Sequence, residues 1–257
     1  MLPEIFDLRG KIAIITGGAS GIGRGIADGL AEAGANIVIA SRRFEICEKA
    51  CDEISKRTGV KSLAHSLDVT SKEEINSLVD DVIKEFGAID ILVNNAGVGG
   101  SEKPILKMND DDWDHTLNTD LKGIFSLTQS VARTMVERAK GGKIINISSI
   151  TAIIGMQNMS AYAASKSGVV QLTKVMALEW VRYNIQVNAI LPGYFETPMN
   201  TEFFDGDIGK KVIKKNIPAG RLGQPEDMKG LAIYLASKAS DFMTGSSLVI
   251  DGGQICW

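Results

Sequence analysis

Early in the chain a short apolar run is followed at once by a glycine-rich turn and a helical pattern, and this order constrains the fold more than any other feature. The run at residues 11–16 reads Lys-Ile-Ala-Ile-Ile-Thr. A short, continuously apolar run is typical of a strand that is buried on both faces of a parallel sheet. Residues 17–23, Gly-Gly-Ala-Ser-Gly-Ile-Gly, then lead into a helical pattern at 24–33 that ends at Gly34. This order predicts the first strand and helix of an α/β fold.

The same alternation continues along the chain. Apolar runs that predict strands lie at 36–40, 61–67, 89–93, 143–148, 185–191 and 246–250, and helical patterns lie at 45–56, 71–86, 110–138, 162–184 and 225–237. This rhythm predicts a doubly wound parallel sheet with helices on both faces and ligands at the carboxyl ends of the strands. A chain of 257 residues that is 44% hydrophobic fits one such domain over residues 1–257.

The composition argues against several classes of protein. A net charge of −3 without a basic block argues against nucleic-acid binding. No apolar run approaches the ~18 residues of a membrane span, and the first residues lack the apolar core of a signal peptide. Cys47, Cys51 and Cys256 are not spaced as zinc ligands, and His65 and His115 are far from them in sequence. We therefore expect a cytoplasmic protein with reduced thiols, no membrane partner and no metal.

The glycine turn has the properties of a phosphate-binding loop. Gly17 and Gly23 allow the backbone to approach a pyrophosphate, and the free N–H groups of the following helix stabilise its charge. The spacing Gly-x-x-x-Gly-x-Gly differs from the common Gly-x-Gly-x-x-Gly fingerprint. The alternative is a tight turn that binds no ligand. The flanking strand and helix favour a dinucleotide site.

The end of the second predicted strand bears on the choice of cofactor. NAD-binding folds usually place an acidic residue there to bind the ribose 2′-OH, whereas an arginine holds a 2′-phosphate. Here the strand ends in Ser41, Arg42 and Arg43. This ending favours NADP(H) over NAD(H). The alternative is that both arginines are solvated residues at the start of a helix.

Residues 144–170 carry the side chains with the clearest chemical use. Tyr162 and Lys166 are four residues apart in a helical pattern, so the ammonium lies beside the phenol. A neighbouring positive charge favours the phenolate, which makes tyrosine a usable proton donor and acceptor near neutral pH. Ser149 ends a predicted strand, where its hydroxyl can hold the oxygen that the phenol protonates. The same Tyr-x-x-x-Lys spacing also occurs on exposed helices, so the function depends on its context.

Asn118 lies inside the predicted helix at 110–138. Asparagine is a poor residue for a helix interior because its side chain competes for backbone hydrogen bonds. It therefore indicates a local kink, and the alternative is an exposed residue on a polar face.

These motifs together resemble the short-chain dehydrogenases/reductases. The motifs are Thr16–Gly23, Asn94–Gly97, Asn118, Ser149, Tyr162–Lys166 and Pro192–Gly193, and the likeness covers residues 10 to 253. The resemblance implies a single-domain Rossmann-like fold with seven strands. Residues 10–150 then form a cofactor half, residues 144–257 a catalytic and substrate half, and residues 194–217 a lid. It also implies an enzyme that interconverts a ketone and a secondary alcohol with NAD(P)(H) and without a metal.

The resemblance assigns a role to each residue of the motifs. Tyr162 is implied to be the general acid/base, Lys166 to lower the phenol pKa and bind the nicotinamide ribose, and Ser149 to hold the substrate oxygen. Ser149 is favoured over its neighbour Ser148 by its spacing to Tyr162. Asn118 is implied to position a water that links Lys166 to solvent.

The resemblance also implies which residues bind the cofactor. They are Gly17, Ser20, Ile22, Gly23, Ser41, Arg42, Arg43, Asp68, Val69, Asn95, Ala96, Gly97, Tyr162, Lys166, Pro192, Gly193, Phe195 and Thr197. Asp68 and Val69 are implied to lie at the adenine, and Phe195 and Thr197 at the carboxamide. Many NADP-preferring relatives have a basic residue where this chain has Ser20, so the expected NADP preference depends on the two arginines after Ser41.

The substrate pocket is expected to be mostly apolar. Its expected residues are Ser149, Ile150, Ile153, Met156, Tyr162, Tyr194, Phe203 and Phe204. They fit a medium-sized apolar ketone, secondary alcohol or acyl thioester, the substrate class of the similar 3-oxoacyl-carrier-protein reductases. Two alternatives stay open, a sugar-acid dehydrogenase of the gluconate 5-dehydrogenase type and a nucleotide-binding sensor without turnover. The resemblance further implies a homotetramer or homodimer built on the helices that contain Asn118 and Tyr162.

Overall fold

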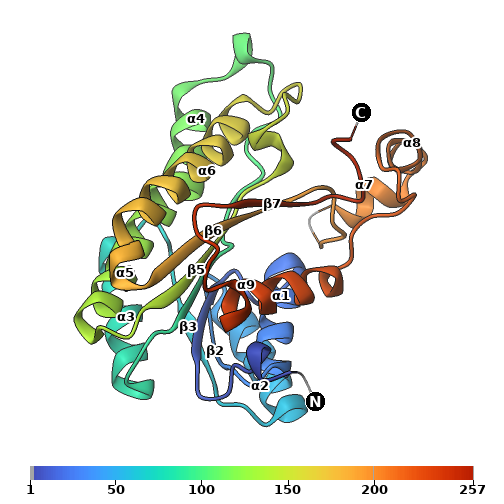
Figure 1. The fold of residues 1–257 in the computed structure, drawn as a ribbon. Helices are drawn as coiled ribbons and strands as arrows, with labels where there is room; N and C mark the ends of the chain where they lie inside the picture. The colour runs from blue at the N-terminus through green and yellow to red at the C-terminus, as the bar shows by residue number, and fades with distance from the viewer. Residues whose placement is uncertain (1–2, 199, 257) are drawn as a thin grey trace.

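A computed structural model describes residues 3–198 and 200–256 of the chain. Seven parallel strands form one sheet in the order β3-β2-β1-β4-β5-β6-β7 (Figure 1). The strands are β1 (Ile12–Thr16), β2 (Asn36–Ser41), β3 (Ser62–Ser66), β4 (Ile91–Asn94), β5 (Gly142–Ile147), β6 (Ile185–Pro192) and β7 (Ser247–Ile250). The predicted seven-stranded parallel sheet is confirmed. Across the described ranges, no helix is both long and apolar enough to cross a membrane.

Helices cover both faces of the sheet, with α1, α2 and α9 on one face and α3, α5 and α6 on the other (Figure 1). The helices are α1 (Gly21–Glu32), α2 (Phe44–Thr58), α3 (Lys72–Phe86), α4 (Asp110–Leu117), α5 (Gly123–Arg138), α6 (Ser160–Trp180), α7 (Thr201–Asp205), α8 (Asp207–Asn216) and α9 (Lys229–Ala236). Short helical turns are η1 (Glu4–Phe6), η2 (Ile105–Lys107), η3 (Asn118–Lys122), η4 (Ile150–Ala152), η5 (Val181–Tyr183), η6 (Pro225–Met228) and η7 (Lys238–Ser240). The helical patterns of the sequence are thus present with shifted ends.

The continuous apolar strands are explained by two cores, one on each face of the sheet. In β1, Ala13 and Ile15 pack with α1, α2 and α9, whereas Ile12 and Ile14 pack with α3, α5 and α6. Successive side chains of a strand point to opposite faces, so a strand buried on both faces has no polar alternation. This is why the apolar runs predicted parallel strands.

Two glycines on α1 allow a late segment of the chain to pack closely against it. A Cβ atom at Gly25 would lie 2.0 Å from the carbonyl oxygen of Pro225, and one at Gly29 would lie 2.9 Å from Cβ of Lys229. Real Cβ atoms essentially never make contacts this short, so η6 and α9 rest on the backbone of α1. The helix that follows the glycine turn is therefore fixed by residues about 200 positions later in the sequence.

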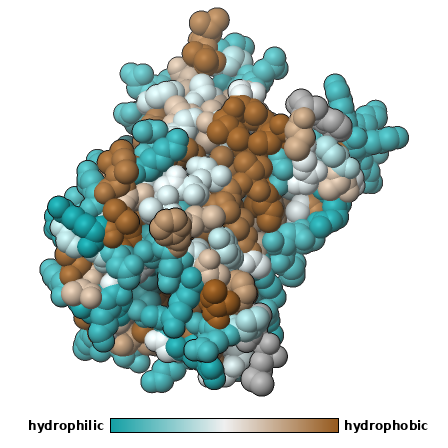
Figure 2. Space-filling model, in the orientation of Figure 1, coloured by the Kyte–Doolittle hydropathy of each residue, from teal (hydrophilic) through white to brown (hydrophobic). Residues whose placement is uncertain are grey.

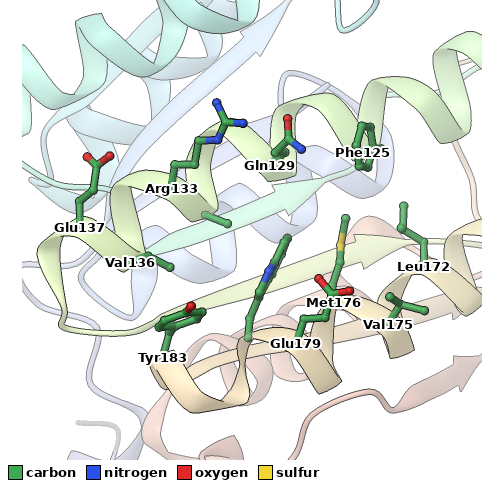
Figure 3. A pocket seen from close by; sticks show the side chains of 12 residues that line it. Phe125, Gln129, Arg133, Val136, Glu137, Leu172, Val175, Met176, Glu179 and Tyr183 are labelled. Carbon is green, nitrogen blue, oxygen red and sulfur yellow. The ribbon is translucent and has the colours of Figure 1, made fainter.

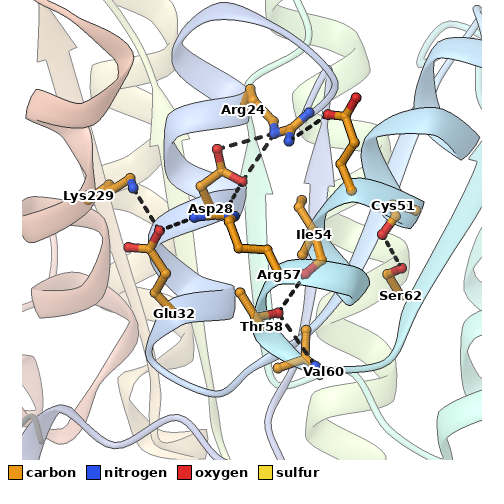
Figure 4. A network of polar contacts seen from close by, with 11 residues as sticks. Arg24, Asp28, Glu32, Cys51, Ile54, Arg57, Thr58, Val60, Ser62 and Lys229 are labelled. Carbon is orange, nitrogen blue, oxygen red and sulfur yellow. Dashed lines mark hydrogen bonds and ion pairs between the residues drawn. The ribbon is translucent and has the colours of Figure 1, made fainter.

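An ion-pair network ties α1 to α2 and α9 on the same face (Figure 4). Asp28 accepts from Arg24 Nε at 3.1 Å and from Arg57 Nη2 at 2.5 Å. Glu32 pairs with Arg57 and, at 2.8 Å, with Lys229 Nζ. Networks of this kind stabilise more than isolated surface pairs because each charge has several partners.

The predicted irregularity at Asn118 is present. Residues 118–122 form a π-helical turn, η3, between α4 and α5. π-turns of this kind are rare and occur mostly at functional sites. The expected lid segment contains two helices, α7 and α8, which lie apart from the helices that cover the sheet (Figure 1).

Candidate active site

A cleft of about 1200 Å³ lies at the carboxyl ends of the parallel strands. Residues predicted from the sequence that line it are Gly17, Ser20, Ile22, Gly23, Ser41, Arg42, Arg43, Asp68, Val69, Asn95, Ala96, Gly97, Asn118, Ser149, Tyr162, Lys166, Pro192, Gly193 and Thr197. The sheet topology explains this convergence because every strand delivers its following loop to the same edge. The cleft thus contains the glycine turn and the reactive tyrosine together.

The glycine turn has the shape of an anion cradle. Gly17 and Gly21 have positive φ angles of 64° and 53°, which favour glycine. A Cβ atom at Gly23 would lie 2.4 Å from both Gly17 O and Asn95 Nδ2. Helix α1 begins at Gly21 without a side-chain cap from Ser20. Its first N–H groups therefore remain available to a pyrophosphate, which fits the phosphates of a dinucleotide.

Thr16 and Asn95 join the glycine turn to the loop after β4. Thr16 Oγ1 accepts from the backbone N–H groups of Asn95 and Ala96, both at 2.9 Å. Asn95 Nδ2 donates to Thr16 O at 2.9 Å and to Gly17 O at 3.3 Å. These bonds fix two cleft walls relative to each other. The role of Thr16 was not predicted from the sequence, where it appeared only as the end of an apolar run.

The end of the cleft next to β2 carries positive charge. Arg42 and Arg43 line it with exposed side chains, and neither has an ion-pair partner within the ranges that the structure covers. Hydrogen bonds from Thr70 at 2.7 and 2.9 Å, helped by the charge of Arg42, hold the pKa of Asp68 below its ordinary value. Asp68 is therefore an anionic acceptor at this end.

Several cleft residues were missed by the sequence analysis. His115, Thr119, Lys122 and Ser126 line the cleft from α4, η3 and α5. Their spacing of three or four residues is that of one helix face, and this was the signal that could have found them.

The strand β5 delivers two serines with different bonding. Ser148 Oγ donates to the carbonyl oxygen of Lys166 at 2.8 Å and so holds α6 against the strand. Ser149 Oγ instead accepts from Thr151 N at 3.1 Å as the N-cap of η4. The hydroxyl proton of Ser149 can therefore be donated into the cleft, and its expected bond to the substrate oxygen stays a prediction.

Tyr162 and Lys166 lie one turn apart on α6, and both line the cleft. Lys166 Nζ is 5.4 Å from the centroid of the Tyr162 ring. The lysine is only 5% exposed. The predicted arrangement of a phenol beside a fixed cation is thus present.

The side chain that contacts Lys166 from the π-turn is Asp120 and not Asn118. Asp120 Oδ2 lies 3.3 Å from Lys166 Nζ, and Asp120 is fully buried, whereas Asn118 is exposed at the cleft surface. Asn118 lines the cleft, and its expected water-mediated link to Lys166 stays a prediction. Two residues that are two positions apart on a helix point in nearly opposite directions, so only one of them faces α6.

Charge and burial act in opposite directions on Lys166. Burial alone lowers the pKa of the lysine, but the Asp120 carboxylate, with Tyr162, more than offsets this effect and holds the pKa above its ordinary value. Lys166 is therefore a charged ammonium inside the protein.

Several aromatic and apolar residues expected around the ligands lie elsewhere. Ile150 is buried, Phe195 packs its ring into the core beside α9, and Phe204 packs with Ile217 and Leu222 in a small core of the lid segment. The residues that do not line the cleft are Ile150, Ile153, Met156, Tyr194, Phe195, Phe203 and Phe204. Part of the reason is that Phe204 on α7 packs edge to face against Tyr194, with the ring centroids 5.2 Å apart.

A family model described as enoyl-(acyl carrier protein) reductase matches residues 17–254 of the chain. The chain belongs to the short-chain dehydrogenase/reductase family. It is 42% identical to a 2-dehydro-3-deoxy-D-gluconate 5-dehydrogenase of Dickeya dadantii, with 99% of each chain covered. It is 40% identical to a 5-keto-D-gluconate 5-reductase of Escherichia coli, with 98% of each chain covered.

A solved structure of the same family has the same fold. It is a gluconate 5-dehydrogenase from Burkholderia cenocepacia in complex with NADP and tartrate, with a TM-score of 0.93 and 40% identity over 99% of this chain and 98% of that one. The protein is therefore a short-chain dehydrogenase/reductase that acts on CH–OH groups with NAD(P).

Proposed function

We propose that Tyr162 exchanges a proton with the substrate oxygen, that Ser149 donates a hydrogen bond to this oxygen, and that Lys166 provides the charge that favours the transfer. The observation that carries the proposal is the buried ammonium of Lys166 beside the Tyr162 ring in the cleft. A nicotinamide cofactor bound there would donate or accept the hydride. The residues themselves orient the reactants, exclude water and move one proton.

Replacing Tyr162 with phenylalanine tests this proposal. We expect Tyr162→Phe to lower kcat about 10²–10⁴-fold because general acid–base catalysis is lost, while cofactor affinity stays within a few-fold of the wild type. Tyr234→Phe, on α9, is the matched control and should keep the wild-type rate. Turnover is followed at the nicotinamide absorbance, and cofactor binding by fluorescence. A Tyr162→Phe enzyme with a near-normal rate would refute the role of the phenol. Tight cofactor binding by the wild type without any turnover would instead support the sensor alternative.

We propose a polyhydroxy acid of the gluconate type as the substrate. Support comes from the relatives at 40–42% identity, which act on 5-keto-D-gluconate and 2-dehydro-3-deoxy-D-gluconate according to their names. The burial of Ile150 and Phe204 removes part of the apolar pocket on which an apolar substrate depended. An acyl thioester is the second candidate because Ile153 and Phe203 remain about half exposed.

A substrate panel distinguishes these two classes. We expect kcat/KM for 5-keto-D-gluconate or 2-dehydro-3-deoxy-D-gluconate to exceed that for an acetoacetyl thioester by at least about a hundredfold, because a site built for hydroxyl groups strongly rejects analogues without them. The opposite order would favour the acyl thioester.

We propose that the enzyme prefers NADP(H). Support comes from the exposed guanidinium groups of Arg42 and Arg43, from Ser41 at the position where NAD-binding folds have an acid, and from the NADP bound by the Burkholderia cenocepacia protein. Arg42→Ala should raise the KM for NADPH about tenfold or more and leave that for NADH nearly unchanged. Arg182→Ala, an exposed arginine next to Tyr183, is the control. Equal effects on both cofactors would contradict the assignment.

We propose that the subunits assemble through α5 and α6 into a dimer or tetramer. A groove of about 440 Å³ lies between these helices (Figure 3), lined by Phe125, Gln129, Ala132, Arg133, Val136, Glu137, Leu172, Val175, Met176, Glu179, Trp180 and Tyr183. Its lining is mostly apolar but also includes Arg133 and Glu179. In a dimer with a twofold axis, Arg133 of each subunit can pair with Glu179 of the other. The apolar side chains on this face explain why the face would be covered.

We also propose a cytoplasmic location, which the free Cys47 and Cys51 thiols support.

A further inference from the structure

The π-turn places a carboxylate inside the protein, next to the lysine of the active site. Asp120 is 0% exposed, and its Oδ2 atom lies 3.3 Å from Lys166 Nζ. Its other oxygen, Oδ1, accepts from Val98 N at 2.8 Å. The lysine itself also lies 3.4 Å from the carbonyl oxygen of Ile147. The ammonium thus sits between a carboxylate and a strand carbonyl.

Two further observations indicate that this carboxylate serves the lysine. Within the described chain, Asp120 Oδ2 is buried without a well-aligned hydrogen bond, so the ion pair with Lys166 is what compensates its burial. Gly97 leaves room for the pair, because a Cβ atom there would lie 3.2 Å from Asp120 Oδ1 and 3.4 Å from Lys166 Nζ. The pair therefore packs against the backbone of Gly97, which lines the cleft.

We propose that Asp120 is the positioning residue of Lys166: its fixed negative charge holds the ammonium in place and keeps it protonated while Tyr162 exchanges its proton. The inference rests on the proposed role of Tyr162. It assigns to the π-turn an electrostatic task, which the carboxylate of Asp120 performs.

The direction of the expected pH effect follows from the groups around the pair. Tyr162 on α6 is the other titratable group that acts on Lys166, and the loop after β4 and strand β5 contribute the backbone groups of Val98 and Ile147. Removing the negative charge makes the ammonium of Lys166 lose its proton at lower pH. Ketone reduction depends on this ammonium, so its loss at high pH should begin at a lower pH.

The test compares Asp120→Asn with Asp114→Asn, an exposed aspartate on α4 that serves as the matched control. For Asp120→Asn we expect the alkaline limb of the kcat/KM profile for ketone reduction to move down by about one pH unit or more, which is a tenfold change in proton affinity. kcat should fall at least about tenfold at pH 8. Asp114→Asn should match the wild type. An Asp120→Asn profile that coincides with that of Asp114→Asn would overturn the proposal.

A thermal double-mutant cycle tests the pair without any turnover. Lys166→Met leaves a buried carboxylate without its cation and should lower Tm, and Lys166→Met combined with Asp120→Asn should recover part of this loss. Strictly additive effects on Tm would overturn the pairing, even if Asp120→Asn alone were too unstable for kinetics. The proposed function fails separately from this inference. If Tyr162→Phe retained its rate, the role of Tyr162 would be refuted, while the coupling between Asp120 and Lys166 in Tm would persist.

Discussion

The hydroxyl of Thr16 links the glycine turn to the loop after β4, and its removal has a calculable cost. Thr16 is 1% exposed, and its Oγ1 accepts from two backbone N–H groups, those of Asn95 and Ala96. Thr16→Val keeps the shape and the strand propensity of the side chain but removes the acceptor. The substitution therefore leaves two N–H groups without a partner and also removes the long 3.4 Å bond that the hydroxyl donates to Val93 O.

The magnitude follows from the burial of these groups. A buried donor without a partner costs about 1–3 kcal/mol. Asn95 and Ala96 are only partly buried, so water compensates in part, and we expect a total loss of about 2 kcal/mol for the pair. For a protein of this size such a loss lowers Tm by about 4–8 °C. The loosened walls should also weaken NADPH binding about tenfold, or about 1.4 kcal/mol.

Differential scanning fluorimetry and a fluorescence titration with NADPH measure the two effects. Thr16→Ser is the matched control, because it keeps the hydroxyl and removes one buried methyl group, at a cost of about 1 kcal/mol. It should bind NADPH as the wild type does. The reasoning is refuted if Thr16→Val binds NADPH within twofold of the wild type, or if Thr16→Ser is destabilised and weakened as much as Thr16→Val.

Three further outcomes are expected. Gly23→Ala should weaken cofactor binding at least about tenfold in the same titration, because its Cβ would lie 2.4 Å from Gly17 O, whereas Gly230→Ala, which meets no atom within 4 Å, should bind normally. Val175→Glu, at the groove between α5 and α6, should reduce the oligomer mass measured by light scattering, and an unchanged mass would contradict the proposed interface. Arg57→Ala should lower Tm by about 2–4 °C, because the loss of its ion pairs costs about 1 kcal/mol of stability. This decrease in Tm should be smaller in 1 M NaCl, and a decrease that does not depend on salt would contradict its electrostatic origin.

The sequence predicted the sheet well because burial on both faces leaves a clear mark. A run such as residues 11–16 has no polar alternation, and the structure shows that its side chains enter two different cores. The glycine turn and the pair Tyr162 and Lys166 were also found, since their chemistry depends on local spacing that a helix or a turn fixes.

The remaining parts of the site depend on tertiary packing. In the segment from Asn118 to Asp120, the residue that faces α6 is set by the phase of the helix and of its π-turn, which spacing alone does not reveal. A buried aspartate is also unexpected from composition, because charged residues are rarely buried unless paired. The aromatic residues after β6 were assigned to a ligand, but Phe204 on α7 packs with Ile217 and Leu222 in a small core of its own.

A further apolar feature lies at the edge of the molecule. In Figure 2 hydrophobic atoms form the tip at the top of the view, where the loop between β4 and α4 extends beyond the helices in Figure 1. Ile105 and Leu106 on η2 are 74% and 99% exposed. Along the chain, this loop continues from Asn95–Gly99, the residues after β4 that line the cleft.

The bare backbone of α1 at Gly25 and Gly29 has a consequence for how the protein can be divided. The late helix α9 occupies the groove that these glycines leave, so the nucleotide-binding portion completes its own interior only with residues from the other end of the gene product. A truncated version that stops after β5 would lack both late segments and leave the backbone of Gly25 and Gly29 uncovered. The part of the chain that carries the glycine turn therefore depends on its late residues for its packing.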